Sequence, residues 1–388
     1  MTAFEHQVRM LSYDELDPAI IARWESLEER ALEPNAYLSP CFVLPALSYL
    51  CSKTEVNNTV FIFVEQPKPC ELDLAGVGVF VHSAGGLRFP LPHLRSFRSL
   101  HSYLSGFLLD RKHGEAALQA IFNFFCRNGG RWHGLDLACM PADGIQAELV
   151  FRVAREFGCQ WHERERSTRS IFSPQDGGEA YLRTQLSAHR LKRLRQAWKR
   201  LEGKGKVEWR TVFGSEVTDS NVESFLELEH KGWKREDGKS LRSNLSHEAF
   251  FRELVNGFRR NKRLFFTELL LDGAVIASTS NLVVGNAGFA FKIGWDIEYA
   301  DTSPGLLNEM AFVQRVSGRC RELTYVDSGA EEGSFIEHLW AGRRSLTHGT
   351  FSLTLAGRAA LKIYASLRRF KVLFRRFQER RNVHQVHR

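Results

Sequence analysis

The sequence predicts a mixed α/β fold built from two similar halves, and three observations support this prediction. Segments with helical spacing of apolar residues alternate with short runs of β-branched and aromatic residues along the 388-residue chain. The order of helices and strands in the first half returns in the second. A chain of this length with 43% hydrophobic residues can bury two ordinary cores. These patterns favour helices packed on a mixed sheet.

The first half should begin with helices and continue into strands. Helices are expected near Asp17–Ala31 and from Ser39-Pro40 to Tyr49, because Ser and Pro are favoured at helix starts. Further along, the sequence predicts strands at Val60–Val64, Ala75–Val81 and Leu104–Leu109, a helix at Glu115–Arg127, a strand at Gly134–Cys139 and a helix at Ile145–Phe157. The charged segment Glu163–Gly178, which contains Ser and Gly, is interpreted as the linker between the halves.

The second half repeats this order with clearer signals. Helices are predicted at Leu182–Leu201, which is basic and amphipathic, and at Phe225–Trp233 and Glu248–Arg259. Strands at Leu264–Leu271 and Val275–Val284 should form a hairpin around Asp272-Gly273. The alternation in Ala287–Trp295 fits a third strand, and a helix from Ser303 and a strand at Leu323–Asp327 complete the half.

The start of the helix at Ser303 is the most informative stretch of the chain. Ser303 suits the N-cap, Pro304 suits the first helical position, and Gly305 keeps side-chain bulk away from the amides. Leu306 and Leu307 then begin the apolar stripe that should pack on a sheet. Free N–H groups at such a start can bind phosphate, although a helix that binds nothing can be capped in the same way.

Composition argues against several classes of protein. No apolar run approaches the roughly 20 residues of a membrane-spanning helix. Met1–Leu16 is too polar for a signal peptide, which favours a cytoplasmic location. The seven cysteines are scattered without a C-x-x-C pair, so reduced thiols are expected rather than disulfides or a metal site. Neither a serine-hydrolase elbow nor a P-loop motif is present.

Most of the net charge of +8 comes from the C-terminal end. Residues 357–388 contain ten Lys or Arg and one acid, whereas the remainder of the chain is nearly neutral. Apolar residues lie between the arginines in the pattern of a basic amphipathic helix. Such a helix could dock on the protein itself, lie on an anionic membrane, or bind a nucleic acid or acidic partner.

Several motifs of the second half resemble one family of bacterial proteins. They are Leu186-Ser187-Ala188-His189-Arg190, Glu229 with Trp233-Lys234, Leu270-Leu271-Asp272-Gly273, Lys292-Ile293-Gly294-Trp295-Asp296, Tyr299-Ala300 and Ser303-Pro304-Gly305-Leu306-Leu307. Together they look like the CelD-like, cellulose-biosynthesis branch of the GNAT acetyltransferase superfamily, which is related to Fem-type peptidyltransferases with two GNAT folds. The match covers roughly Tyr181–Arg344, and Trp24, Tyr37 and Ser39-Pro40 resemble the family's N-terminal half more loosely.

The resemblance implies tandem GNAT-like domains, with a degenerate domain at 1–165, an acyltransferase domain at 179–352 and a basic C-terminal helix at 357–388. It implies an N-acyltransferase that moves an acyl group from acetyl-CoA, another acyl-CoA or a related carrier to an amine, without a metal. The acceptor would be a small molecule, glycan or peptide of envelope or exopolysaccharide metabolism, used in the cytoplasm or at the inner membrane. Alternatives are an aminoacyl-tRNA-dependent Fem-type transferase, which the basic segment Arg190–Lys206 would suit, and a non-catalytic polysaccharide-assembly factor.

The resemblance also implies roles for particular residues. The carrier would lie against Ser303, Pro304, Gly305, Leu306 and Leu307, and the substrate against Trp233, Lys234 and Lys292. An amine that attacks a thioester must lose a proton, so the candidate bases are Asp296, Asp327, Glu298 and Asp301, while Tyr299 or Tyr325 could return a proton to the thiolate. One departure concerns the family's Tyr-Lys pair, because this chain has Phe335-Ile336-Glu337 there and the role of that pair stays open.

Overall fold

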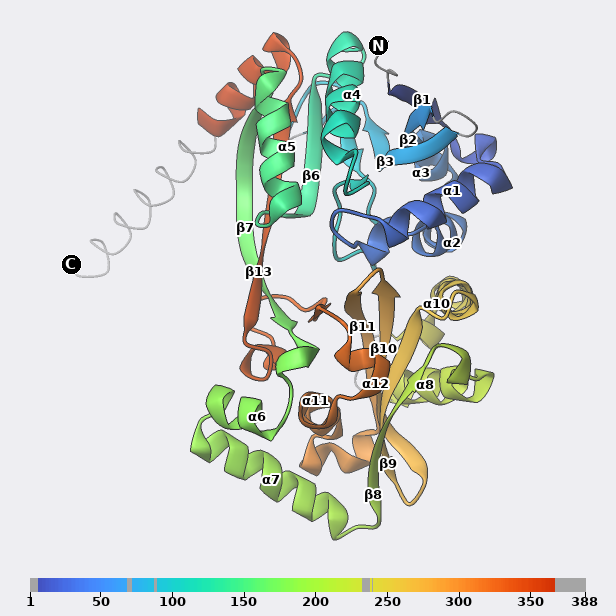
Figure 1. The fold of residues 1–388 in the computed structure, drawn as a ribbon, viewed down its shortest axis with the longest axis vertical. Coiled ribbons are helices and arrows are strands. Elements are labelled where there is room, and N and C mark those ends of the chain that lie inside the picture. Colours follow the sequence, from blue (N-terminus) through green and yellow to red (C-terminus); the bar gives the residue numbers. More distant parts are fainter. Residues whose placement is uncertain (1–5, 68–71, 87–88, 232–237, 239, 367–388) are drawn as a thin grey trace, which may run out of the picture.

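The computed structural model describes residues 6–67, 72–86, 89–231, 238 and 240–366, and the structural statements below concern these residues (Figure 1). The elements up to residue 172 are called the N-terminal half. They are β1 (Gln7–Leu11), α1 (Pro18–Glu29), α2 (Pro40–Leu50), α3 (Lys53–Asn58), β2 (Thr59–Pro67), β3 (Leu72–Ser83), β4 (His93–Ser96), β5 (Leu108–Leu109), α4 (Gly114–Arg127), β6 (Gly134–Pro141), α5 (Ile145–Glu156) and β7 (Gln160–Phe172). Asp17 and Ser39 cap α1 and α2 as their sequence positions indicate. The strand predicted at Leu104–Leu109 is confined to its last two residues.

The elements from residue 179 to 340 are called the C-terminal half. They are α6 (Glu179–Gln185), α7 (Ala188–Glu202), β8 (Val207–Phe213), α8 (Asp219–Lys231), α10 (Leu245–Arg260), β9 (Leu264–Leu271), β10 (Ala274–Val284), β11 (Ala287–Trp295), α11 (Pro304–Arg315), α12 (Gly318–Arg321) and β12 (Tyr325–Asp327), and β13 (Gly342–Ser352) follows them. The single helix predicted at Leu182–Leu201 is wrong, because Leu186 is extended and Ser187 caps a new helix by accepting a hydrogen bond from the Arg190 amide.

The described strands form one mixed sheet of thirteen strands in the order β1-β2-β3-β4-β6-β13-β7-β12-β11-β10-β9-β8, with β5 paired to β3. Each half contains the same unit. In the first, β3 pairs antiparallel with β4, and β4 pairs parallel with β6 after the crossover through α4. In the second, β10, β11, α11 and β12 repeat this arrangement. The predicted mixed α/β fold of tandem, similar units is confirmed.

The predicted linker at Glu163–Gly178 is wrong, because most of it belongs to the long strand β7. This strand pairs with β13 over eleven residue pairs, from Gly342 opposite Ile171 to Ser352 opposite Gln160, and its last residues also pair with β12. β13 in turn pairs with β6 of the N-terminal half. The β7 and β13 pair therefore carries the sheet from one half into the other, as Figure 1 shows.

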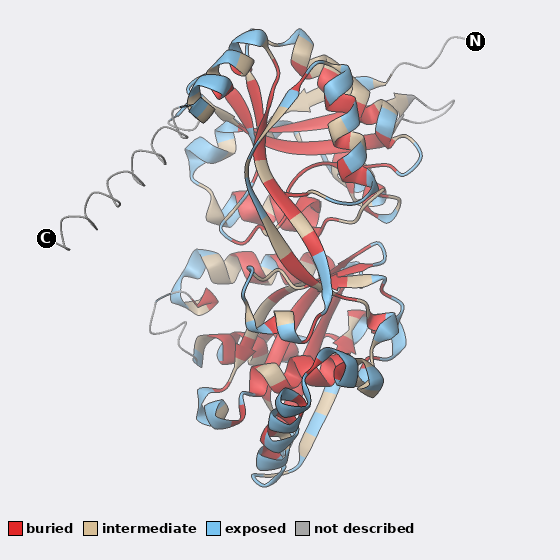
Figure 2. Cartoon of the chain, turned by 90° about the vertical axis from the view of Figure 1, so that its left-hand side faces the viewer, coloured by how far each residue is buried: buried red, intermediate tan, exposed pale blue. Residues whose placement is uncertain are grey.

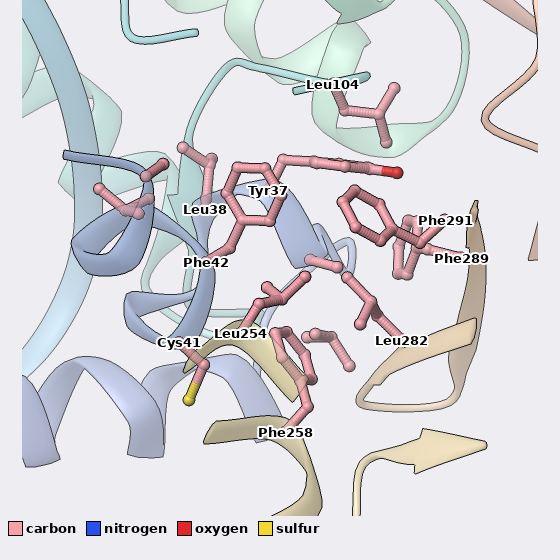
Figure 3. Close-up of a cluster of buried hydrophobic side chains, with 14 of the residues drawn as sticks. Tyr37, Leu38, Cys41, Phe42, Leu104, Leu254, Phe258, Leu282, Phe289 and Phe291 are labelled. Atoms are coloured by element: carbon pink, nitrogen blue, oxygen red, sulfur yellow. The ribbon is translucent and has the colours of Figure 1, made fainter. Parts of the chain in front are cut away.

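Three apolar cores cover the two faces of the sheet. The largest is shared by both halves, because α2 packs on α10 over it and residues of α1 and α8 contribute to it. Figure 3 shows Tyr37 and Phe42 pointing toward Phe289 and Phe291 of β11 in this shared core. A second core lies under α4 and α5, and a third under α6, α7 and α11. The strands of both halves are mostly buried while the helices expose their outer faces (Figure 2).

The first turns of the predicted C-terminal helix dock on the N-terminal half. Residues 355–366 are helical, Leu361 is buried, and Arg358 donates a hydrogen bond to the carbonyl oxygen of Gly158 at 2.6 Å. The rest of the predicted helix, 367–388, lies outside the described residues. No described helix has the length and hydropathy needed to span a bilayer.

Candidate functional site

Strands β11 and β12 separate after a short parallel contact. Only three residue pairs join them, the last being Phe289 with Asp327. Just beyond, Ser280 of β10 pairs with Lys292 while Asn281 pairs with Ala290, so Phe291 is an extra, bulged residue. A bulge bends its strand, which accounts for the divergence of β11 from β12. The gap between residues 290–295 and the chain that follows Asp327 is called the fork below.

The bulge also exchanges the two faces of β11. Phe289 and Phe291 both point into the core under α10, whereas Ile293 and Trp295 point to the opposite face and lie against Gly305 of α11. Gly294 correspondingly lies against the α8 backbone. The end of β11 therefore presents Trp295 to the start of α11.

The start of α11 is left open. Ser303 has left-handed backbone angles, with φ 55° and ψ 59°, and its side chain makes no capping hydrogen bond. The prediction that Ser303 caps the helix through its side chain is thus wrong, although Pro304 does occupy the first helical position. Within the part of the chain that the structure describes, no side chain caps the first amides after Pro304, so these N–H groups can donate hydrogen bonds to an anionic ligand.

The equivalent helix of the N-terminal half, α4, also lacks a side-chain cap, but a carboxylate lies just before its start. The Asp110 carboxylate accepts hydrogen bonds from the Lys112 and His113 amides, at 2.8 and 3.2 Å, immediately before α4. Its other oxygen is paired with Arg30 at 2.7 Å. Ser105 binds β6 of this half beyond its pairing with β4, because its amide donates to the Cys139 carbonyl oxygen.

Gly305 is needed for packing as well as for access. A Cβ atom at this position would lie 3.1 Å from Cδ1 of Trp295 and 3.3 Å from Cδ1 of Ile293. The glycine therefore allows α11 to approach β11 closely. Leu307 is fully buried in the core below, while Leu306 is partly buried.

Positive charge lies beside the open helix start. The connector between β11 and α11 contains the 3-10 helix η6 (Ile297–Thr302), which packs on α7. Arg200 of α7 donates to the Asp301 carbonyl oxygen at 3.1 Å, and Lys204 pairs with the Asp301 carboxylate at 2.9 Å. The hydrogen bond from Lys204 lowers the pKa of Asp301, which makes this exposed carboxylate a poor base.

The predicted base Asp296 is buried, and both of its carboxylate oxygens have partners. Its Oδ2 atom is paired with Lys231 at 2.8 Å, and its Oδ1 atom accepts a hydrogen bond from the Glu298 amide at 3.1 Å. The ion pair with Asp296 raises the pKa of Lys231. Glu298 itself is exposed, and the Tyr299 ring lies 5.6 Å from the Lys204 ammonium.

Asp327 lies elsewhere in the molecule. It pairs with Phe289, and Asp296 follows Phe289 by seven residues, just past the end of β11, so about 20 Å of nearly extended chain separates Asp296 from the residue opposite Asp327. Asp327 is buried between Arg344, at 3.1 Å, and Arg169, at 3.6 Å. Tyr325 lies under Arg344, and burial raises its pKa. The candidate catalytic residues are therefore not gathered in one place.

Of the predicted substrate-binding residues, Lys292 lies on the α10 side of the sheet. Its ammonium group donates a hydrogen bond to the hydroxyl oxygen of Tyr103 in the N-terminal half at 2.8 Å. Trp233 and Lys234 lie outside the described residues, in the connection after α8.

The sequence analysis missed a buried polar group inside α11. Glu309 is fully buried and its Oε1 atom accepts a hydrogen bond from Thr279 at 2.6 Å, while Asn308 binds Thr267 and Trp209. Burial raises the pKa of Glu309 to about 7. The polar pair Asn308-Glu309 within an apolar helical stripe is the signal that could have indicated this group. Among the described residues, no cluster of potential metal ligands is found.

The open helix start and the fork lie within a segment that matches a known family. Residues 188–335 match the model of the acetyltransferase (GNAT) domain, so the C-terminal half carries a GNAT-type domain. The structure of FemX resembles the whole chain with a TM-score of 0.56 and 11% identity, covering 92% of this chain and 100% of that one. A conserved protein of unknown function from Bacteroides thetaiotaomicron VPI-5482 gives a TM-score of 0.52 and 11% identity, covering 90% and 100%. At this identity the likeness shows the fold alone, and no curated protein matches the sequence.

Proposed function

We propose that this protein is an N-acyltransferase that takes an acyl group from CoA, or from a related phosphopantetheine carrier, and transfers it to an amine. The observation that carries the proposal is the uncapped start of α11 beside the fork, in the half that matches the GNAT domain. The Asp110 carboxylate lies just before the start of α4, where its negative charge would disfavour an anionic carrier, and this supports one active and one degenerate half.

The geometry suits each part of such a carrier. A pyrophosphate would accept hydrogen bonds from the first amides of α11, and Arg200 and Lys204 would add positive charge nearby. The thioester arm would enter the fork, where the edge of β11 beyond Phe289 is not paired with β12. Backbone groups of that edge can orient the arm and stabilise the oxyanion.

For the acceptor, we propose an amine on a glycan or peptide of envelope or exopolysaccharide metabolism, following the CelD-like resemblance. The basic face of α7 favours a second candidate, transfer from aminoacyl-tRNA. Arg190, Lys192, Arg193 and Lys199 are all exposed there. A non-catalytic assembly factor is the third possibility, and it predicts no carrier binding.

The test uses a matched pair of substitutions at Ser303, which is exposed and left-handed. Asp and Asn both tolerate this conformation, but only Ser303→Asp places a negative charge at the helix start. We expect calorimetry to show saturable binding of acetyl-CoA or a long-chain acyl-CoA to the wild type and Ser303→Asn, and at least about tenfold weaker binding to Ser303→Asp. Equal binding by the two variants would contradict the site, and no binding by the wild type would favour aminoacyl-tRNA or a non-catalytic role.

A peripheral membrane contact is proposed for 367–388, the part of the basic segment beyond the docked turns. Its support is the sequence pattern of interleaved arginines and apolar residues. Deleting 367–388 should abolish sedimentation with vesicles containing anionic lipid. Unchanged sedimentation would contradict the contact.

A further inference from the structure

Two thiols lie in contact at the edge of the core under α4 and α5. Cys126 belongs to the last turn of α4 and Cys159 immediately precedes β7, and their Sγ atoms are 3.8 Å apart. Both are free thiols, with Cys159 buried and Cys126 partly buried. A disulfide requires a sulfur–sulfur distance of about 2.05 Å, so an approach of about 2 Å, within the reach of side-chain rotation, would join them.

The two sulfur atoms are suited to different roles in such a reaction. The hydrogen bond with Cys159 stabilises the Cys126 thiolate and lowers the pKa of Cys126 to about 7, against the opposing effect of burial. The same hydrogen bond, together with burial, raises the pKa of Cys159. Because the thiolate is the nucleophile, the partly exposed Cys126 is the thiol that reacts first with an oxidant, and Cys159 is placed to displace the product.

The backbone beside the pair can accommodate the approach of the two sulfur atoms. Gly158 is exposed and has a φ of 70° in the turn between α5 and β7. Cys159 lies outside the ladder of β7 and β13, which begins with Gln160 opposite Ser352. Cys126 is the last residue but one of α4. A shift of Cys159 toward Cys126 therefore requires no break in the strand pairing of β7.

The turn that carries Cys159 also holds the docked turns of the C-terminal helix. The carbonyl oxygen of Gly158, the residue before Cys159, accepts the 2.6 Å hydrogen bond from Arg358. Leu361, one helical turn further on, is buried. In Figure 1 these docked turns lie beside the start of β7.

The end of α4 contacts the other side of the same helix start. A Cβ atom built on Gly129 would lie 2.8 Å from Cγ2 of Thr354 and 3.1 Å from the Cys126 carbonyl oxygen. Thr354 in turn accepts a hydrogen bond from the Gly357 amide at 3.0 Å. The helix start is thus held by the two segments to which the thiols belong, and a bond between the thiols would fix these segments to each other.

We propose that Cys126 and Cys159 form a redox modification site, at which a low-molecular-weight disulfide oxidises the pair to an intrachain disulfide that secures the docked turns of the C-terminal helix. The Cys126 thiolate attacks one sulfur atom of the oxidant and forms a mixed disulfide, while the oxidant's own disulfide breaks and releases one thiolate. Cys159 then gives its proton to solvent and attacks the Cys126 sulfur, which releases the second thiolate. The protein loses two electrons and two protons, and the oxidant becomes two thiols. This site is independent of the proposed acyl transfer.

The experiment treats the full chain with excess oxidised glutathione at pH 8, blocks the remaining thiols with N-ethylmaleimide, and maps the tryptic peptides by mass spectrometry. The wild type should give a peptide in which Cys126 is linked to Cys159, and dithiothreitol should reverse the link. Cys159→Ser keeps the attacking thiol and should stop at the mixed disulfide of Cys126 with glutathione. Cys126→Ser should leave Cys159 unmodified. A folded wild type without the linked peptide would overturn the site, and glutathione on Cys159 in Cys126→Ser would overturn the assigned order of attack.

The control is Cys51→Ser, which removes a partly buried thiol whose sulfur contacts no other thiol among the described residues. This variant should form the link as the wild type does. Hydrogen exchange then tests the effect on the C-terminal helix, since the amides of residues 357–361 should exchange about tenfold more slowly in the oxidised than in the reduced wild type. Equal exchange in a protein whose link has been mapped would overturn the effect on the helix while leaving the modification site intact.

Discussion

Glu28 of α1 and Arg263, which immediately precedes β9, form an ion pair of 2.9 Å between the two halves of the chain. Burial raises the pKa of Glu28 to about 7, and the opposing charge of Arg263 limits the shift. The pair lies at the border of the shared core between α1 and the C-terminal sheet. The halves are thus joined by a buried charge pair as well as by apolar contacts.

Breaking this pair should destabilise the whole protein. Arg263→Met would leave the Glu28 carboxyl buried without its cation and should lower the free energy of unfolding by about 3–5 kcal/mol. The double variant Glu28→Gln/Arg263→Met should recover most of that loss. Urea unfolding at pH 8 measures the free energy of unfolding of the single and the double variant. A loss below about 1 kcal/mol in Arg263→Met would contradict the stabilising role of the ion pair.

Glu309 should make stability depend on pH. Its pKa is raised from 4.5 to about 7 in the folded protein, so its contribution is complete below pH 4.5 and is lost as the pH rises to 7. Glu309→Gln keeps an acceptor for Thr279 and has no charge. At pH 8 this variant should exceed the wild type in unfolding free energy by up to about 3 kcal/mol, with little difference at pH 4. Denaturation at pH 4 and pH 8 measures the difference in unfolding free energy between Glu309→Gln and the wild type. The same difference at both pH values would contradict the raised pKa of Glu309.

Replacing Gly305 even by alanine should destabilise the protein. Because an added Cβ would lie 3.1 Å from Trp295, Gly305→Ala should cost about 1–3 kcal/mol of stability. Gly130→Ala is the control, since open space surrounds that position. Thermal unfolding compares the two. If both variants have the melting temperature of the wild type, the close approach of α11 to β11 is not required for stability.

The two buried aspartates should differ in their structural importance. Asp327→Asn would remove the carboxylate that pairs with Arg169 and would leave Arg344 with Glu33 alone, at 3.6 Å, at a cost of about 3–5 kcal/mol. Asp296→Asn would release Lys231, which is half exposed, so its ion-pair contribution should be below about 1 kcal/mol. Urea unfolding of both variants distinguishes them, and a reversed order would argue that Asp327 is not held in place by these arginines.

Local periodicity was sufficient to predict many elements. The bounds of β9 and β11 agree with the prediction, and those of β10, α4 and α5 agree within one residue, because these segments combine regular apolar spacing with clear turns. β7 was missed because its sequence alternates charged residues and its partner β13 lies about 180 positions later in the chain. Nothing local indicates such a pairing.

The site was only partly predictable for the same reason. Pro304 and Gly305 marked the helix start, but the bulge at Phe291 depends on the register with β10, and it decides the face to which Lys292 and Trp295 belong. The hydrogen bond between Tyr103 and Lys292 joins residues 189 positions apart. Asp296 and Asp327 were both candidate bases for one reaction, and the parallel register places them far apart.

The late position of β13 has a consequence for synthesis on the ribosome. β6 gains one of its two neighbouring strands only from residues 342–352, so the N-terminal sheet cannot be completed while its own sequence alone has emerged. Until then the nascent chain presents an unpaired strand edge of the kind that promotes association between chains. Premature termination before residue 342 would therefore release an aggregation-prone product rather than an independent N-terminal unit.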